Sequence, residues 1–543
     1  MKFRYSRYGL NSRDRVLERF LEVLPGAFSW TIIIGMGLLS WREPLIAAAI
    51  MVAFVLYWVL RLLYMNIFLL LSYIRLSVEK KSDWMQLVKG VDDGDFARQI
   101  EGCGRDIQCR LENFIRRSQL KTLQEAGQRP PKSEDIYHLV IIPVIRETRD
   151  VVEPGIESIA NGQYPSKRVL VMIALEERAP DNVKEEIFLL QKKYQGQFKD
   201  FLVSIHPDGI QGEAKVKGAN ATWAARQAAD YFQKHGIPYD NVIVSCFDAD
   251  TVAQPEYLAC LTYYFMITPF RTTASYQPIP VYHNNIWDVP SFARIIDIGT
   301  SFFQLVESTN PEKMVTFSSH SMSFKALVEV GYWPVDMISD DSAIFWKAFI
   351  HYDGNYQAVP IYTTVSMDIA HGRTHWGTFV SIYKQKRRWA WGVENLPIVM
   401  RAFLGSRSIP LYKRGMLGLR LFDSFVSWAT WAFLLTFITW LPTMFAGKEF
   451  ASTTVYYTAP RVKGMIFSLS LVGLLICMMI SLLLLPRDKT RNFLSGFAHI
   501  LEWIFIPGVI LALSAIPALD AQTRLMFGRY MEFRVTEKYR PGK

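Results

Sequence analysis

Residues 241–250 read NVIVSCFDAD, a short apolar run that ends in Asp248-Ala249-Asp250. A short run of this kind, rich in β-branched residues, predicts a strand that is buried on both faces. Such strands belong to parallel sheets, in which ligands bind at the carboxyl ends of the strands. Two carboxylates at that end are hard oxygen ligands suited to Mg²⁺ or Mn²⁺. A solvated turn is the alternative for this motif taken alone, because Asp-x-Asp often occurs by chance.

Three similar runs precede this strand, and helical stretches alternate with them. Alternation of strands and helices predicts a mostly parallel sheet with helices on both faces, which is an α/β fold. The strand-like runs are LVIIPV (139–144), RVLVMIAL (168–175) and FLVSI (201–205), and the helical stretches include 180–196 and 215–234.

The composition of the 543-residue chain indicates a membrane protein with a soluble part. Hydrophobic residues make up 50% and charged residues 20%, below the usual quarter, so a disordered chain is excluded. Five cysteines are too few for a disulfide scaffold. The net charge of +10 suits a membrane surface or an anionic substrate. No basic helix with base-reading residues stands out, so nucleic acid is not expected as a partner.

The apolar residues cluster at both ends of the chain. Residues 27–41 and 44–60 predict a hairpin of transmembrane helices, each slightly short of the roughly 20 residues that cross a bilayer. Residues 419–445, 465–485 and 497–518 are three further candidates. Lys and Arg beside these segments predict a multi-pass protein of the cell membrane with a cytoplasmic N-terminus, and the two crossings of the hairpin are consistent with a cytoplasmic α/β domain. The basic start lacks a signal-peptide cleavage site, so no removed leader is expected.

The number of C-terminal segments conflicts with the charge of the tail. Residues 520–543 are basic, which predicts a cytoplasmic tail, yet three crossings would place it outside. We expect 497–518 not to cross, because Pro507 and Pro517 can break it into a re-entrant or interfacial element. An interfacial helix at 419–445 is the alternative.

Five regions are expected along the chain. They are a basic N-terminus with a transmembrane hairpin (1–79), a helical linker or insert (80–135), the α/β domain (136–400), interface and transmembrane helices (401–519) and a tail (520–543). The insert carries no recognisable chemistry.

Two further charged motifs follow the Asp248–Asp250 motif. Ser339-Asp340-Asp341 precedes a helix-like stretch and suits a general base that accepts a proton from a hydroxyl. Simple helix capping by Ser339 and the carboxylates is the alternative. Residues 385–389 (QKRRW) combine cations that can hold a diphosphate with an aromatic ring that can stack on a sugar. An interfacial membrane anchor is the alternative there.

The order of these motifs resembles the membrane-integrated family 2 glycosyltransferases, which include the cellulose, chitin and hyaluronan synthases. That family has D-x-D, (T/S)-(E/D)-D and Q-x-x-R-W motifs in this order and at similar distances. Its K-x-x-A/G-x-N run is matched by 215–220 (KVKGAN), and 533–538 (FRVTEK) resembles the gating loop of bacterial cellulose synthase catalytic subunits. The resemblance covers residues 136–400 and the tail, and it implies a GT-A-like (Rossmann-like) domain.

The resemblance also implies roles for individual residues. Asp248 would contact the nucleotide and the metal, Mg²⁺ or Mn²⁺, and Asp250 would bind that metal. Asp341 would be the catalytic base, with Asp340 on the acceptor side in the place usually held by Glu. The remaining implied roles are diphosphate binding for Arg388, acceptor binding for Gln385 and Trp389, and nucleotide binding for Lys215, Thr536 and Lys538.

One departure concerns the base of the nucleotide. The family commonly has an Asp-Asp-Gly type turn after the second strand, whereas this chain has Glu176-Glu177-Arg178. We assign Glu176 and Glu177 to nucleotide binding, with a UDP-sugar favoured and the base left open. A C-terminal cyclic-dinucleotide module is not expected, because the chain ends five residues after Lys538.

These features predict an inverting, processive membrane glycosyltransferase. It would transfer a sugar from a nucleoside-diphosphate sugar to a growing polysaccharide acceptor and help to move the polymer through the lipid bilayer. A non-processive transferase that adds one sugar to a lipid-linked or short glycan is one alternative. A catalytically inactive membrane scaffold with a sugar-nucleotide fold is another. The donor sugar, the linkage and the need for accessory subunits stay open.

Overall fold

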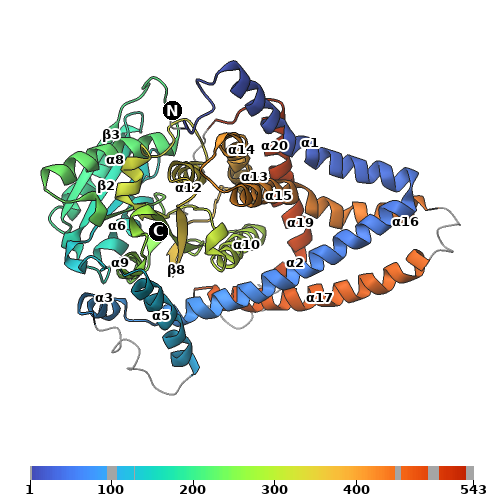
Figure 1. Ribbon diagram of the computed structural model, residues 1–543, viewed down its shortest axis with the longest axis horizontal. Coiled ribbons are helices and arrows are strands. Elements are labelled where there is room, and N and C mark those ends of the chain that lie inside the picture. Colours follow the sequence, from blue (N-terminus) through green and yellow to red (C-terminus); the bar gives the residue numbers. More distant parts are fainter. Residues whose placement is uncertain (1–2, 95–106, 128, 447–453, 487–500, 533–543) are drawn as a thin grey trace. The chain divides into compact units, whose positions relative to one another are not determined.

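The computed structural model describes residues 3–94, 107–127, 129–446, 454–486 and 501–532 (Figure 1). The chain divides into two compact units, which are described separately. The first comprises 1–6, 74–284 and 307–368, and the second comprises 7–73, 285–306 and 369–543.

The first unit is built on one mixed sheet of eight strands in the order β3-β2-β1-β4-β7-β6-β8-β5. The neighbouring strands β3, β2, β1 and β4 are parallel to one another, and β6 is parallel to β8. Strands β7 and β5 run antiparallel to their neighbours. The predicted α/β class is confirmed. The strands are β1 (Tyr137–Val144), β2 (Val169–Glu176), β3 (Asp200–His206), β4 (Val242–Cys246), β5 (Val252–Ala253), β6 (Ala274–Val281), β7 (Ser321–Ser323) and β8 (Gln357–Ser366).

Helices pack on this sheet and enclose the core. All eight residues of β2 are buried, as expected for a parallel strand covered on both faces. Helix α8 packs on β1, β2 and β3, and α9, which is buried along its whole length, packs on β8. The helices of this region are α6 (Arg149–Ala160), α7 (Asp181–Tyr194), α8 (Lys217–Lys234), α9 (Tyr257–Ile267), α11 (Phe324–Glu329) and α12 (Asp340–His351).

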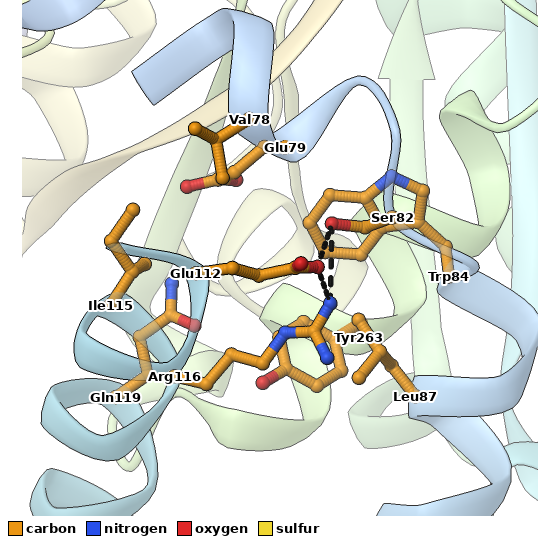
Figure 2. Close-up of a pocket in the computed structure, with 10 residues that line it drawn as sticks. All are labelled: Val78, Glu79, Ser82, Trp84, Leu87, Glu112, Ile115, Arg116, Gln119 and Tyr263. Carbon is orange, nitrogen blue, oxygen red and sulfur yellow. Dashed lines mark hydrogen bonds and ion pairs between the residues drawn. The ribbon is translucent and has the colours of Figure 1, made fainter. Parts of the chain in front are cut away.

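The segment before the sheet contains two helices, α3 (Trp84–Asp92) and α5 (Ile107–Glu125). Together with the end of α2 and with α9 they line a small pocket (Figure 2). On its wall Arg116 contacts the Glu112 carboxylate and donates to the Ser82 hydroxyl at 3.3 Å, and Ser82 donates to Glu112 at 2.8 Å. These contacts fasten α5 to the turn that follows α2.

The second unit is helical. Three helices of the described part of the chain are long and apolar enough to cross a membrane, and a bent pair would make a fourth. Helices α2 and α17 run side by side, with the Cys477 thiol donating to the Asn66 side-chain oxygen at 3.5 Å (Figure 1). The helices are α1 (Ser12–Arg42), α2 (Pro44–Glu79, of which residues to 73 belong here), α10 (Ser291–Glu307), α13 (His375–Ala390), α14 (Asn395–Gly405), α15 (Leu411–Thr436), α16 (Leu441–Phe445), α17 (Thr454–Leu484), α19 (Ile506–Ile510) and α20 (Ile516–Met526).

The helix break that we expected at the prolines is found in another segment. Residues 503–526 form one helical run through Pro507 and Pro517, with a π turn at Leu511–Ala515 between them. A π turn provides new partners for the carbonyls that a proline leaves unpaired, so the helix can continue. The bend, of 44°, lies instead between Leu411–Thr436 and Ile438–Phe445.

Candidate functional site

Asp248 and Asp250 lie directly after β4, at the carboxyl end of the parallel strands. The Thr251 N–H donates to the Asp248 carbonyl oxygen at 2.9 Å and closes a tight turn around them. Ser319 has a left-handed backbone (φ 57°), and its hydroxyl accepts the Asp248 N–H at 3.3 Å. The Ser318 hydroxyl donates to the Asp248 carboxylate. The loop before β7 therefore orients Asp248.

Asp250 belongs to a second, more enclosed cluster. Its Oδ2 accepts the Asp368 N–H at 2.8 Å, and the residue is 2% exposed. The Asn284 amide donates to the Asp250 carbonyl oxygen at 2.8 Å and to the Asp368 carboxylate at 3.0 Å. Asn284 and Asp368 were not predicted from the sequence. They follow β6 and β8, two strands that were not predicted either, whereas Asp248 was found because it follows a predicted strand.

Asp340 and Asp341 are the first residues of α12. Ser339 holds the N-cap position, but its side chain makes no capping hydrogen bond. The Thr316 hydroxyl donates to the Asp341 carbonyl oxygen at 2.6 Å and holds the start of the helix. The Asp341 side chain is 26% exposed and that of Asp340 only 4%, so Asp341 is the carboxylate that a substrate can reach.

Lys217 joins these carboxylates. It is the first residue of α8, and its Nζ lies 2.8 Å from Asp248 Oδ1, 3.1 Å from Asp341 Oδ1 and 4.0 Å from Asp340 Oδ2. The predicted nucleotide-binding lysine was Lys215, and Lys217 was not predicted from the sequence. Its place at the start of a helix that follows a parallel strand is the signal that could have found it.

The charges of this cluster shift the pKa values of its members. Burial alone would lower the pKa of Lys217, but Asp248, Asp341 and Asp340 together raise it well above its ordinary value. Burial lowers the pKa of His320, and the nearby Asp341 only partly opposes this effect. A protonated Lys217 and a neutral His320 therefore border the carboxylate of Asp341.

Glu176, Glu177 and Lys215 form a separate group near the ends of β2 and β3. Glu176 is buried and lies 3.2 Å from Arg178 Nε and 3.4 Å from His206 Nδ1. Glu177 is exposed and accepts the Asp208 N–H at 2.9 Å. Lys215 is 63% exposed and pairs with Asp208 at 3.0 Å. Lys217, and not Lys215, is thus the lysine beside Asp248.

The QKRRW motif lies on α13 in the second unit. Gln385 is buried, whereas Arg388 and Trp389 are partly buried. The neighbouring Arg387 pairs with Asp520 at 2.8 Å. The approach of Arg388 to Asp341 stays a prediction. Thr536 and Lys538 lie outside the described residues.

The donor set suits a divalent metal that is shared with a substrate. Asp248 and Asp341 direct oxygens toward one cation, the Lys217 ammonium. In the described segments no three His, Cys, Asp or Glu side chains form a metal-holding cluster. Mg²⁺ is commonly held by one or two carboxylates together with substrate phosphates. Asp248 therefore fits an ion that a diphosphate helps to bind, and the assignment of Asp250 as a second ligand stays a prediction.

Comparison with known sequences identifies the domain class. Residues 243–486 match the family model "Glycosyl transferase family group 2". The predicted resemblance to family 2 glycosyltransferases is therefore confirmed over this stretch.

Two curated relatives are synthases of one polymer. A poly-β-1,6-N-acetyl-D-glucosamine synthase of Staphylococcus epidermidis is 23% identical over 300 residues, 53% of this chain and 60% of its own length. The synthase of Staphylococcus aureus strain MW2 is 23% identical over 273 residues, 48% of this chain and 56% of its own length. The chain thus spans less than two thirds of the length of these relatives.

Solved glycosyltransferase structures show a limited similarity. The mannosyltransferase PcManGT from Pyrobaculum calidifontis, in complex with GDP-Man and Mn²⁺, gives a TM-score of 0.41 at 12% identity over 82% of this chain and 100% of its own. Residues 1–349 of S. aureus TarS, in complex with UDP-GlcNAc, give 0.36 at 11% identity over 74% of this chain and 94% of their own.

Proposed function

We propose that the protein is an inverting, processive polysaccharide synthase of the cell membrane that uses a nucleoside-diphosphate sugar. The observation that carries the proposal is the convergence of Asp248 and Asp341 on Lys217 at the carboxyl end of the sheet, where both aspartates lie in the stretch that matches the family 2 glycosyltransferase model. A charged cluster at this edge suits the binding and transfer of a phosphorylated substrate.

Asp341 acts as the general base in this proposal. Its carboxylate is partly exposed and lies 3.1 Å from the Lys217 ammonium, and a carboxylate in this place can accept a proton from an acceptor hydroxyl. The hydroxyl oxygen then attacks the anomeric carbon from the side opposite the diphosphate, which inverts the configuration. Asp340 lies beside the base and lines the acceptor side.

The departing diphosphate is the second charge to be stabilised. Lys217 and Arg388 supply cationic donors, and electrostatic stabilisation of a leaving group is usually a large part of catalysis. A bound Mg²⁺ or Mn²⁺, held by Asp248 and Asp250, would neutralise the diphosphate oxygens. Glu176, Glu177, Lys215, Thr536 and Lys538 contact the nucleotide, and Gln385 and Trp389 contact the acceptor.

The proposed orientation in the membrane rests on the location of the donor substrate. Sugar nucleotides are made in the cytoplasm, so the sheet domain faces the cytoplasm and the apolar helices make several crossings. The names of the curated relatives make UDP-N-acetylglucosamine the first donor to test and an N-acetylglucosamine polymer the first product to seek.

Replacement of Asp341 by Asn tests the assignment of the base. The purified protein is incubated with a panel of nucleotide sugars and Mg²⁺ or Mn²⁺, and the products are sized. We expect the wild type to make polymer and Asp341→Asn to lose transfer while it still binds UDP. Transfer by this variant at the wild-type rate would show that another group is the base.

The length of the product separates this proposal from its alternatives. A long polymer from one nucleotide sugar supports a processive synthase, and addition of a single sugar supports a non-processive transferase. UDP binding with no transfer from any donor supports an inactive scaffold.

A further inference from the structure

Lys386, the second residue of the QKRRW motif, is buried between α10 and α13. Its side chain is 3% exposed and that of Asp297 is 1% exposed. The ammonium contacts the Asp297 carboxylate and donates to the Thr300 hydroxyl at 3.0 Å. Its Nζ also lies 3.8 Å from the centre of the Trp389 ring, which is a cation–π contact. A lysine ammonium has three N–H donors, and these partners can engage all of them.

The Thr300 hydroxyl is itself held in place. It donates to the Ile296 carbonyl oxygen at 3.2 Å, so its lone pairs are directed to Lys386. Asp297 and Thr300 are three residues apart on α10 and therefore lie on one face of that helix. Lys386 and Trp389 are likewise three residues apart on α13. The four side chains make a connected set that fixes the Trp389 ring relative to α10.

Stability alone is a poor explanation for this arrangement. Removing two charges from water costs more than their attraction returns unless every remaining polar atom is satisfied. Within the described residues, Asp297 Oδ2 is buried without a hydrogen-bond partner. Burial lowers the pKa of Lys386 and raises that of Asp297, and each partner's charge opposes the shift of the other. What the pair supplies is a fixed geometry around Trp389.

We propose that Lys386 and Asp297 form a positioning pair that sets the Trp389 ring for the acceptor sugar. The proposal rests on the proposed function, in which Trp389 meets the acceptor. Because the ammonium covers one face of the ring, the sugar contacts the ring on the side away from Lys386. A ring that tilts freely would hold the acceptor less firmly and would release the polymer sooner.

A neutral double variant separates positioning from stability. Lys386→Met with Asp297→Leu keeps the approximate volumes and removes both buried charges without leaving a buried polar group unpaired, so the chain should fold with an unfolding temperature at or above that of the wild type. With UDP-N-acetylglucosamine, Mg²⁺ and short N-acetylglucosamine oligosaccharides, we expect the KM for the oligosaccharide to rise about tenfold, which lies between the values for exposed and fully buried cation–π contacts. The KM for the nucleotide sugar should stay within about twofold, and the polymer should be shorter.

The controls identify which idea fails. Lys384→Met removes an exposed lysine of the same helix and should leave both KM values and the polymer length unchanged. If the wild type transfers no sugar, the proposed function fails. If the wild type is active and the double variant keeps the wild-type acceptor KM and polymer length, the positioning pair alone is refuted.

A milder variant covers the case in which the double variant does not fold. Thr300→Val removes the hydroxyl acceptor and keeps the shape of the side chain. We expect it to raise the acceptor KM about threefold, with the donor KM unchanged. An unchanged acceptor KM in a folded Thr300→Val protein then overturns the inference.

Discussion

Replacement of Lys217 by Met should leave an uncompensated group of carboxylates in the sheet domain. At an effective dielectric constant of about 20, the separations of 2.8 Å and 3.1 Å correspond to gross attractions of about 6 and 5 kcal/mol. Desolvation of Lys217 offsets much of this, and Asp248 and Asp341 keep some contact with water. Loss of one partner of a buried pair costs about 3–5 kcal/mol, and we take the lower end here.

The measurement is the thermal unfolding of the purified full chain in detergent. A loss of about 3 kcal/mol in a domain of this size lowers the unfolding temperature by about 6 °C. The matched control is Lys325→Met, because Lys325 pairs with Asp240 at a similar distance of 3.0 Å on the surface. Exposed pairs contribute about 0–1 kcal/mol, so this variant should unfold within about 2 °C of the wild type.

Addition of a divalent cation provides a second test of the role of Lys217. Mg²⁺ added without nucleotide brings a new cation to the carboxylates, so it should raise the unfolding temperature of Lys217→Met more than that of Lys325→Met. Equal unfolding temperatures for the two variants without ligand would refute the view that Lys217 compensates Asp248 and Asp341.

Three further predictions concern pH, packing and metal. Burial lowers the pKa of the His138 side chain to about 3. As the pH falls below about 6.5, this side chain is therefore protonated in the unfolded chain but not in the folded one, and the stability of the fold decreases. His138→Leu should flatten the fall in unfolding temperature between about pH 6.5 and 4.5, and an unchanged slope would contradict this. A methyl group on Gly218 would lie 2.5 Å from the Pro334 carbonyl oxygen and 3.1 Å from the Asp340 Cβ, so Gly218→Ala should lower both stability and transfer. Gly299→Ala, with open space around the added methyl group, should not lower the unfolding temperature. EDTA should abolish transfer and Mn²⁺ or Mg²⁺ restore it, and transfer that persists in EDTA would exclude the role proposed for Asp248 and Asp250.

The first half of the sheet was predictable because its strands carry a simple signal. Residues 168–175 were expected to be a strand, and β2 spans Val169–Glu176. The second half lacks that signal. Strand β6 contains Pro278 and Pro280 although it lies inside the sheet, and its register with β8 shifts between Gln277 and Ile279. Such an irregularity lets a strand contain residues without an N–H. Strand β7 has three residues, too few for any pattern.

The residues of the candidate site also divide into those that carry a clear signal in the sequence and those that do not. Asp248 and Asp250 were found because two carboxylates follow a clear strand, and Asp341 because it starts a helix. Lys217 was missed because Lys215 and Lys217 both fit a basic run, and only the start of α8 separates the exposed one from the buried one. Asp368 was missed because its contact with Asp250 depends on the pairing of β5 with β8.

An experimental structure of the full chain with UDP and Mn²⁺ tests the central proposal most directly. We expect the anomalous signal of Mn²⁺ beside the carboxylates of Asp248 and Asp250, the diphosphate between that ion and the Arg388 guanidinium, and Asp341 open to the acceptor. A diphosphate bound far from Asp341, or an Arg388 that faces away from it, would contradict the proposal.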